Sequence, residues 1–167
     1  ADSFLASCRL AIGSPTPDNV YAILALFLFD VDRFKRINDE RGHGAGDEVL
    51  RAIGSTLRKT CRPYDTPCRY GGDEFAILLP RCDVKAGARI AHDVCWSVFQ
   101  YCFEYDQQIF RIGSSIGLKE WTANSMGVEQ VIVEADAACY KGKRKGRNRV
   151  ELADHLECAG IAPIGKD

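Results

Sequence analysis

The sequence predicts an α+β domain, in which long helices accompany short β-hairpins. Residues 22–30 form a continuous apolar run, which is typical of a strand buried on both faces. Gly71-Gly72 separates two short strand-like segments, which indicates a hairpin. Three longer stretches, at 47–61, 84–99 and 128–145, carry apolar residues at helical spacing. This mixture favours an α+β or mixed sheet over a doubly wound parallel sheet.

The first half of the chain contains seven expected elements. In order, they are a helix over 2–12, a loop over 13–19, a strand over 22–30, helices over 32–41 and 47–61, and strands over 68–70 and 74–79. Gly42, Gly44 and Gly46 are expected to form a turn between the two middle helices. This glycine segment is neither a Walker loop nor a dinucleotide-binding fingerprint, because it lacks their spacing and follows a helix.

The second half is expected to contain two helices and a second hairpin. These elements are a helix over 84–99, strands over 102–105 and 109–121 that turn near 106–108, a helix over 128–145 that Gly146 ends, and a strand over 149–152. Residues 1–152 are therefore expected to form one domain. Residues 153–167, which contain Gly and Pro without a clear pattern, are expected to be a tail or linker.

Bulk composition limits the classes of function. The 167 residues suit one domain, and 46% of them are hydrophobic, which is enough for a core. The formal net charge of −1 argues against a polyanion-binding domain, so any basic surface must be local. The longest apolar run covers residues 21–29, far short of the roughly 20 residues that a membrane helix needs. No signal peptide is evident, so we expect a cytoplasmic segment without membrane contact, although the parent protein could be membrane-anchored.

The eight cysteines are expected to be free thiols. None forms a C-x-x-C pair, and no histidine lies at zinc-finger spacing from them. Several lie in apolar periodic segments, where cysteine behaves as a small hydrophobic residue. Free thiols fit a reducing cytoplasm better than a disulfide framework does.

Two acidic segments are candidates for a metal site. Asp30 and Asp32 end the first apolar strand, where carboxylates are costly without a positive partner, and Mg²⁺ prefers oxygen ligands. Alternatively, Asp32 caps the following helix. Asp73 and Glu74 follow the glycine pair and would join this cluster if the hairpin lies beside the strand, whereas an ordinary tight turn would leave them solvated.

A basic cluster lies near the C-terminal end. Six of the nine residues from Lys141 to Arg149 are Lys or Arg. They could be a solvated helix end, because cations favour that end of the helix dipole. They could also be a nucleic-acid patch. A narrower reading is that Lys143 and Arg147, four apart, face one phosphate group.

Taken together, these segments resemble the GGDEF family of diguanylate cyclases. Five stretches match in order between about residues 20 and 150. They are Asp30–Asn38 (D-x-D-x-F-K-x-I-N), Gly42–Leu50 (G-H-x-x-G-D-x-x-L), the signature Gly71–Phe75 itself, Ser115–Gly117 (S-I-G), and Asp136–Asn148 (D-x-A-x-Y-x-x-K-x-x-G-R-N).

The resemblance implies a nucleotidyl-cyclase-like palm, a mostly antiparallel central sheet flanked by helices. It implies that Mg²⁺ or Mn²⁺ is held by Asp30, Asp73, Glu74 and the Val31 carbonyl. Catalytic roles fall to Asp73, Glu74 and Lys35, the last of which would hold the triphosphate with Lys143 and Arg147. Substrate contacts would come from Asn38 and Asp47 on guanine, with His43 nearby, and from the backbone at Gly71 and Gly72.

The implied activity is condensation of two GTP molecules into cyclic di-GMP and two pyrophosphates. Because each domain would hold one GTP, catalysis would require a homodimer. A carboxylate at Asp47 can accept both N1–H and the N2 amino group of guanine, and adenine offers neither donor, so GTP is expected rather than ATP. Arg62 and Asp65 match the family's R-x-x-D site for inhibition by cyclic di-GMP, and Arg89 is a candidate second arginine. The alternative is that Arg62 and Asp65 form an ordinary ion pair in a turn.

One departure concerns the N-terminus. Family members usually carry D-x-L-T-G-L-x-N-R before the first helix, and this chain begins after that point, so we expect a fragment that lacks a sensory or dimerisation domain. Two other functions remain open: a GGDEF-type module that only senses GTP or cyclic di-GMP, and a nucleic-acid-binding domain. The intact set Asp30, Asp73, Glu74 and Asn38 argues against a pure sensor. The net charge of −1 argues against nucleic acid.

Overall fold

The structure is a computed structural model that describes residues 24–121 and 127–153, with side chains from residue 31 onward. The expected helix over 2–12, the loop over 13–19 and all but residue 153 of the expected tail lie outside the described residues. Within the described part, no helix is both long enough and apolar enough to cross a bilayer.

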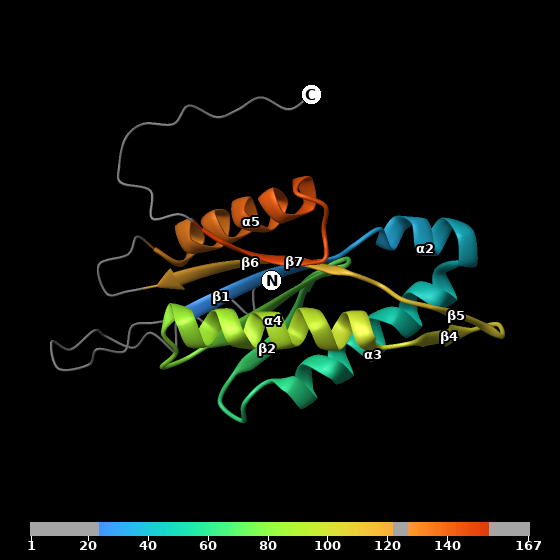
Figure 1. The fold of residues 1–167 in the computed structure, drawn as a ribbon, viewed down its shortest axis with the longest axis horizontal. Coiled ribbons are helices and arrows are strands. Elements are labelled where there is room, and N and C mark those ends of the chain that lie inside the picture. The colour runs from blue at the N-terminus through green and yellow to red at the C-terminus, as the bar shows by residue number, and fades with distance from the viewer. Residues whose placement is uncertain (1–23, 122–126, 154–167) are drawn as a thin grey trace, which may run out of the picture.

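The centre of the fold is a five-stranded sheet with the order β2-β3-β1-β6-β7 (Figure 1). Its strands are β1 (Leu24–Val31), β2 (Thr66–Gly71), β3 (Glu74–Leu79), β6 (Ser114–Trp121) and β7 (Arg149–Leu152). All neighbouring pairs are antiparallel except β6 and β7, which are parallel. The apolar β1 lies in the middle of the sheet, as its continuous hydrophobic run predicts. The expected α+β fold with a mostly antiparallel central sheet is therefore confirmed.

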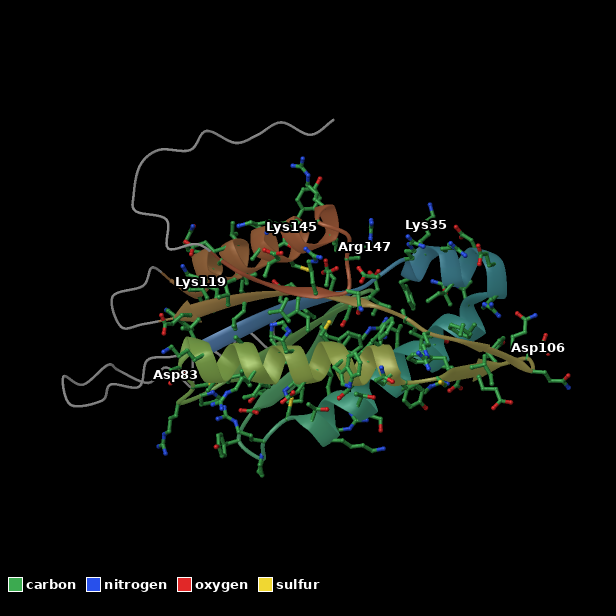
Figure 2. All side chains as sticks on the ribbon, in the orientation of Figure 1. Lys35, Asp83, Asp106, Lys119, Lys145 and Arg147 are labelled. Atoms are coloured by element: carbon green, nitrogen blue, oxygen red, sulfur yellow. The ribbon has the colours of Figure 1, made fainter. Side chains whose placement is uncertain are left out.

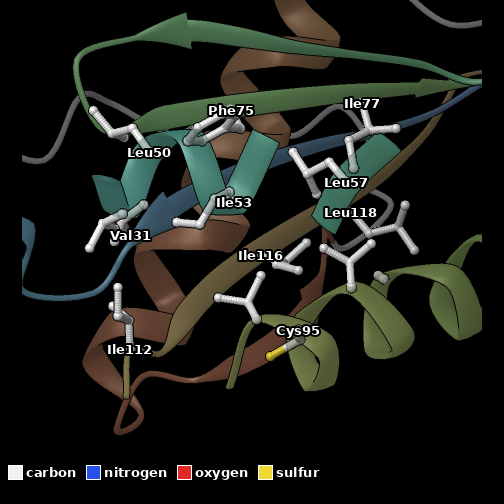
Figure 3. Packing of buried hydrophobic residues seen from close by; sticks show 14 of the residues in the cluster. Val31, Leu50, Ile53, Leu57, Phe75, Ile77, Cys95, Ile112, Ile116 and Leu118 are labelled. Atoms are coloured by element: carbon white, nitrogen blue, oxygen red, sulfur yellow. The ribbon is translucent and has the colours of Figure 1, made fainter. Parts of the chain in front are cut away.

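Helices cover both faces of this sheet (Figure 1). The described helices are α2 (Phe34–Arg41), α3 (His43–Thr60), α4 (Val84–Gln100) and α5 (Val128–Arg144). The larger core joins α3 and α4 to one face, where Ile53 and Leu57 pack with Ile77 and Ile116 (Figure 3). A smaller cluster, which includes Ala76, Leu78 and Val131, lies under α5 on the opposite face.

A glycine permits the close approach of α5 to the sheet. An added Cβ at Gly117 would lie 1.9 Å from the Ala135 carbonyl oxygen, which is backbone and cannot rotate away. The helix can therefore lie directly on β6 only because position 117 has no side chain. This contact fixes where the C-terminal end of α5, which carries Lys143, projects from the sheet.

The second hairpin differs from the sequence prediction. Strand β4 (Phe103–Tyr105) pairs with β5 (Gln108–Phe110) in a separate two-stranded sheet, and the expected strand over 109–121 is divided into β5 and β6. The turn residues Asp106 and Gln107 both have positive φ, as a tight two-residue hairpin turn requires. The prediction failed because β6 pairs with β1 and not with β4, which periodicity along one segment cannot reveal.

The glycine segment between α2 and α3 is also shorter than expected. Only Gly42, with φ 82°, separates the two helices, and His43–Gly46 is the first turn of α3. Gly44 and Gly46 lie in close contact with other side chains. A Cβ added at Gly44 would lie 2.6 Å from the Tyr105 hydroxyl, and one added at Gly46 would lie 2.0 Å from the Asn38 side-chain oxygen. These glycines therefore allow close packing and are not turn residues.

Candidate functional site

The tip of the β2–β3 hairpin lies beside the end of β1. The Val31 N–H donates to the Asp73 carbonyl at 3.2 Å, and the strand register pairs Asp30 with Glu74. The structure therefore places the hairpin where the acidic segments were expected to meet. Asp73 is half-buried and Glu74 is exposed.

Asp32 has a structural role that the sequence did not suggest. It does not cap α2, whose N-cap residue is Arg33. Its buried carboxylate accepts from the Ser115 hydroxyl at 2.8 Å and from the Asn148 N–H at 2.9 Å, so protein donors occupy it. The capping interpretation was wrong because the hydrogen bonds to Asp32 come from Ser115 and Asn148, which lie far along the chain and not in α2. Asp32 thus ties β6 and the segment before β7 to the end of β1.

The residues present fit a hard divalent cation, although the described side chains alone do not form a metal cluster. Among the described side chains, no group of three or more metal-ligating residues comes together, and the side chain of Asp30 lies outside that set. Carboxylates at Asp73 and Glu74, beside the backbone carbonyls at the end of β1, are the oxygen donors that Mg²⁺ prefers. The donor chemistry at this hairpin therefore suits the expected metal.

A groove of about 680 Å³ lies between α3 and the β2–β3 hairpin. Its lining includes Asp47 from the helix and Arg69 and Phe75 from the hairpin. The predicted guanine-reading carboxylate thus opens onto the same space as the hairpin. Asn38, His43, Gly71 and Gly72 are not among the residues that line this groove.

Three arginines in this groove were not identified from the sequence. Arg51 and Arg58 follow Asp47 at i+4 and i+11, so the helical period of the sequence predicts Asp47, Arg51 and Arg58 on one face of α3. Arg69 carries no such signal. Its Nε donates to the Gly72 carbonyl at 2.8 Å, which holds the side chain along the hairpin turn.

The side chain of Asn38 lies against the first turn of α3. Its amide oxygen occupies the place where a Cβ at Gly46 would be, and Gly46 directly precedes Asp47. Asn38 on α2 and Asp47 on α3 are therefore brought to neighbouring positions, as a shared guanine contact requires. His43 is exposed at the start of α3.

The predicted phosphate-binding cations come from two separate elements. Lys35 is exposed on α2, Lys143 is half-buried near the end of α5, and Arg147 follows that helix. Figure 2 shows Lys35 and Arg147 projecting to the same side of the sheet, the side that α5 covers. The helical-spacing argument for Lys143 and Arg147 was wrong, because α5 ends at Arg144 and Arg147 has a left-handed φ of 63°.

Much of the remaining basic cluster is neutralised within the domain. Lys145 forms an ion pair with Glu151 at 2.8 Å, and Arg149 lies 3.7 Å from the same carboxylate group. The Nε of Arg147 is 3.9 Å from an Asp32 oxygen. These pairs argue against a continuous nucleic-acid patch at residues 141–149.

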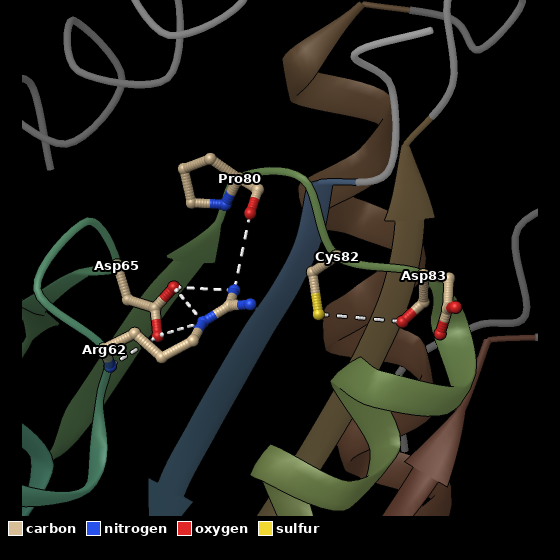
Figure 4. A network of polar contacts seen from close by, with 5 residues as sticks. All are labelled: Arg62, Asp65, Pro80, Cys82 and Asp83. Carbon is tan, nitrogen blue, oxygen red and sulfur yellow. Dashed lines mark hydrogen bonds and ion pairs between the residues drawn. The ribbon is translucent and has the colours of Figure 1, made fainter.

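Arg62 and Asp65 form a compact ion pair (Figure 4). The Arg62 Nη2 donates to Asp65 at 2.8 Å, and the Arg62 backbone N–H donates to the other carboxylate oxygen at 2.7 Å. The hydrogen bond that the Arg62 guanidinium donates to the Asp65 carboxylate raises the pKa of the guanidinium. The Asp65 side chain is fully buried, while 28% of the Arg62 side chain is exposed. The turn ion pair that was considered from the sequence is therefore present.

Two further residues bear on this site. Tyr64, which the sequence did not single out, is exposed and lies under the guanidinium of Arg62, with 4.7 Å from Cζ to the ring centroid. Arg89 is exposed on α4, and among the described residues it makes no hydrogen bond or ion pair with Arg62. The structure therefore provides one arginine and one aromatic ring for a planar ligand, and it leaves the role of Arg89 a prediction.

The six described cysteines form no disulfide, as expected. Burial raises the pKa of the Cys61 thiol and of the Cys68 thiol to about 11. Thiols with such high pKa values are poor nucleophiles near neutral pH, so these two cysteines serve as packing residues.

The family model described as "Diguanylate cyclase, GGDEF domain" matches residues 17–149. Among curated proteins, probable diguanylate cyclase DgcE of Escherichia coli is 36% identical over 151 residues, which cover 90% of this chain and 14% of that protein. Diguanylate cyclase DgcP of Pseudomonas aeruginosa is 40% identical over 130 residues, which cover 78% of this chain and 19% of that protein. The chain thus spans less than a fifth of the length of these two relatives.

Solved structures give the same answer for the fold. The GGDEF domain of PA1120 (YfiN or TpbB) from Pseudomonas aeruginosa is similar with a TM-score of 0.84 and 32% identity, covering 92% of this chain and 94% of that one. The GGDEF domain of DgcB from Caulobacter crescentus, solved in complex with c-di-GMP, has a TM-score of 0.78 and 31% identity, covering 91% of this chain and 86% of that one.

Proposed function

The chain belongs to the GGDEF family of diguanylate cyclases, and we propose that it condenses two molecules of GTP into cyclic di-GMP with release of two pyrophosphates. The observation that carries the proposal is the contact between the hairpin tip and the end of β1. There, the Val31 N–H meets the Asp73 carbonyl at 3.2 Å, and the register pairs Asp30 with Glu74. The groove at Asp47 opens beside this hairpin and offers a place for the base.

Each domain would bind one GTP, so the reaction would need two domains facing each other. The 3′-hydroxyl of one GTP attacks the α-phosphorus of the other, the bond to the β-phosphate breaks, and pyrophosphate leaves. Repeating the step with the roles exchanged closes the ring. A homodimer is therefore the proposed active form, because one domain holds only one of the two nucleotides.

Side chains of this domain would bind and orient the substrate. Lys35, Lys143 and Arg147 would contact the triphosphate, where their charge offsets the charge that develops on leaving pyrophosphate. Asp73, Glu74, Asp30 and the Val31 carbonyl would hold Mg²⁺ or Mn²⁺, which would supply charge neutralisation at the phosphates. Glu74 could instead accept the proton of the attacking hydroxyl.

Asn38 and Asp47 would select guanine. Asp47 can accept from N1–H and the N2 amino group, while ATP would leave its carboxylate without donors. GTP should therefore bind more tightly than ATP by a factor of roughly 10⁴. Calorimetric competition measures this ratio directly, and equal competition by the two nucleotides would exclude Asp47 as the guanine contact.

The central experiment tests turnover. The chain is fused to a dimerising helix and incubated with GTP and Mg²⁺, and the nucleotides are separated by chromatography. We expect cyclic di-GMP from the unmodified chain, none from Asp73→Ala, and a normal yield from Asp93→Ala, which removes an exposed carboxylate on α4. Normal turnover by Asp73→Ala would exclude this metal site, and tight GTP binding without product from the unmodified dimer would support the sensor function.

Feedback inhibition by cyclic di-GMP at Arg62 and Asp65 is proposed as the regulation of this activity. The partly exposed guanidinium and the Tyr64 ring offer a charged fork and a flat surface, which suit phosphate and guanine. Arg62→Ala should weaken cyclic di-GMP binding and leave GTP binding nearly unchanged. Inhibition that excess GTP relieves would place the inhibitor in the active site instead.

A further inference from the structure

A second groove, of about 320 Å³, lies along α2. We call it the arginine groove. It is lined by five arginines, two carboxylates and two phenylalanine rings: Arg33, Arg36, Arg41, Arg111, Arg147, Asp32, Glu40, Phe99 and Phe110. The lining residues of α2 and its N-cap lie at i, i+3, i+4, i+7 and i+8 from Arg33, so one face of the helix forms this wall. Asn38 lies on another face of the helix, toward Gly46 of α3.

The carboxylates of the arginine groove do not balance its cations. Glu40 pairs with Arg36 at 2.7 Å. Asp32 accepts from Ser115 and from the Asn148 N–H, and it lies 3.9 Å from Arg147. Arg33 and Arg111 form no ion pair with a described residue, and Arg41 hydrogen-bonds the neutral Gln108. Three guanidinium groups therefore converge on one groove without a described carboxylate partner.

Two of these arginines, Arg41 and Arg111, lie over aromatic rings, which position them without neutralising their charge. The Arg41 guanidinium lies over the Phe110 ring, with 4.6 Å from Cζ to the centroid, and that of Arg111 lies over Phe99 at 6.0 Å. Such fixed, uncompensated guanidinium groups beside apolar rings attract an anion strongly and lose little freedom on binding it.

We propose that the arginine groove binds a small polyphosphate anion of the pyrophosphate class. Guanidinium forks match phosphate oxygens in pairs, and a multiply charged anion can contact Arg33, Arg41 and Arg111 together. The groove shares Arg147 with the proposed triphosphate site, so its ligand also changes the charge near GTP. Binding itself does not require cyclase activity. The anion could be free pyrophosphate or the phosphate chain of a nucleotide.

The test is calorimetric titration of pyrophosphate, without metal and at fixed low salt, into the whole chain. The background double variant Lys35→Gln/Lys143→Gln removes the two cations that belong to the proposed active site but do not line the groove, so the remaining binding reports on the groove. Adding Arg33→Gln and Arg111→Gln should weaken pyrophosphate binding roughly tenfold or more. Arg144→Gln, which removes an exposed arginine outside the groove, should leave it nearly unchanged.

The outcomes separate this proposal from the proposed function. Equal pyrophosphate affinity with and without Arg33 and Arg111 would overturn the groove site, as would an equal loss of affinity in Arg144→Gln. Neither result would count against the proposed turnover of GTP. If the unmodified chain binds pyrophosphate in the groove but does not turn over GTP, only the cyclase proposal is contradicted. Titration with ATP distinguishes the two sources: ATP binding tighter than pyrophosphate identifies a nucleotide, and weaker binding identifies the free anion. Circular dichroism of each variant confirms that the fold is retained.

Discussion

Asp32 and Asp65 are both buried carboxylates in loops next to the sheet, yet they are satisfied in different ways. Asp65 bonds to Arg62, three residues earlier, through the guanidinium and the backbone N–H. Asp32 bonds to Ser115 and Asn148, which belong to other parts of the chain, and its arginine neighbour lies 3.9 Å away. The Asp65 pair stabilises one turn, whereas Asp32 joins three segments of the fold. We therefore expect the neutral, distant partners of Asp32 to contribute more to stability than the local ion pair of Asp65.

Asp32→Ala should have the largest effect. It leaves the buried Ser115 hydroxyl without its acceptor, which is costly, and it also removes the acceptor of the part-buried Asn148 N–H bond. We expect a loss of about 3 kcal/mol in the free energy of unfolding, measured by urea denaturation. Asp93→Ala on the exposed face of α4 is the control, with an expected change below about 0.5 kcal/mol.

Asp65→Ala should have a smaller effect of about 1 to 2 kcal/mol. The guanidinium of Arg62 is partly exposed, so water replaces the lost carboxylate, and its contacts with the Pro80 carbonyl and Tyr64 remain. The same urea measurement decides the order of the two variants. A loss for Asp65→Ala that exceeds the loss for Asp32→Ala would reverse the comparison.

Double-mutant cycles sharpen the difference between the two arginine contacts. The Arg62–Asp65 cycle should give a coupling free energy of about 1 kcal/mol, because the two groups share several hydrogen bonds at 2.8 to 3.1 Å. The Arg147–Asp32 cycle should give a value near zero, because the contact is longer and Arg147 is exposed. Similar couplings in the two cycles would contradict the view that neutral donors satisfy Asp32.

The last expected effect is a pH dependence at Cys61, beside the Arg62–Asp65 turn. Burial first, and the charge of Asp65 second, raises the pKa of this thiol from 9.0 to about 11. Above pH 9 the unfolded chain releases the proton and the folded chain keeps it, so stability falls as the pH rises from about 9 towards 11. Urea denaturation at pH 8, 9 and 10 should show a shallower fall for Cys61→Ala.

The exposed Cys102 provides the control for this pH effect. Cys102→Ala should follow the pH dependence of the unmodified chain. An unchanged slope in Cys61→Ala would show that burial of Cys61 does not contribute, and would leave Cys68, whose pKa burial also raises to about 11, as the other candidate.

The sequence by itself determined the elements whose signals are local. The run at β1 predicted a buried strand, and Gly71-Gly72 predicted the hairpin that carries Asp73 and Glu74. Helices α4 and α5 were predicted to within one or two residues at each end, because amphipathic periodicity and terminal residues act over a few positions. The Arg62–Asp65 ion pair was foreseen as an alternative for the same reason, since its spacing is three residues.

Only the tertiary structure decided the features that depend on residues far apart in the chain. The partners of Asp32, the pairing of β6 with β1, and the meeting of α2, α4 and β5 in the arginine groove all join distant segments. Periodicity reports which face of an element is apolar but not which element covers it, so these contacts leave no local signal. The glycines at 46 and 117 show the limit most clearly, because the atoms that exclude a Cβ there belong to Asn38 on α2 and to Ala135 on α5.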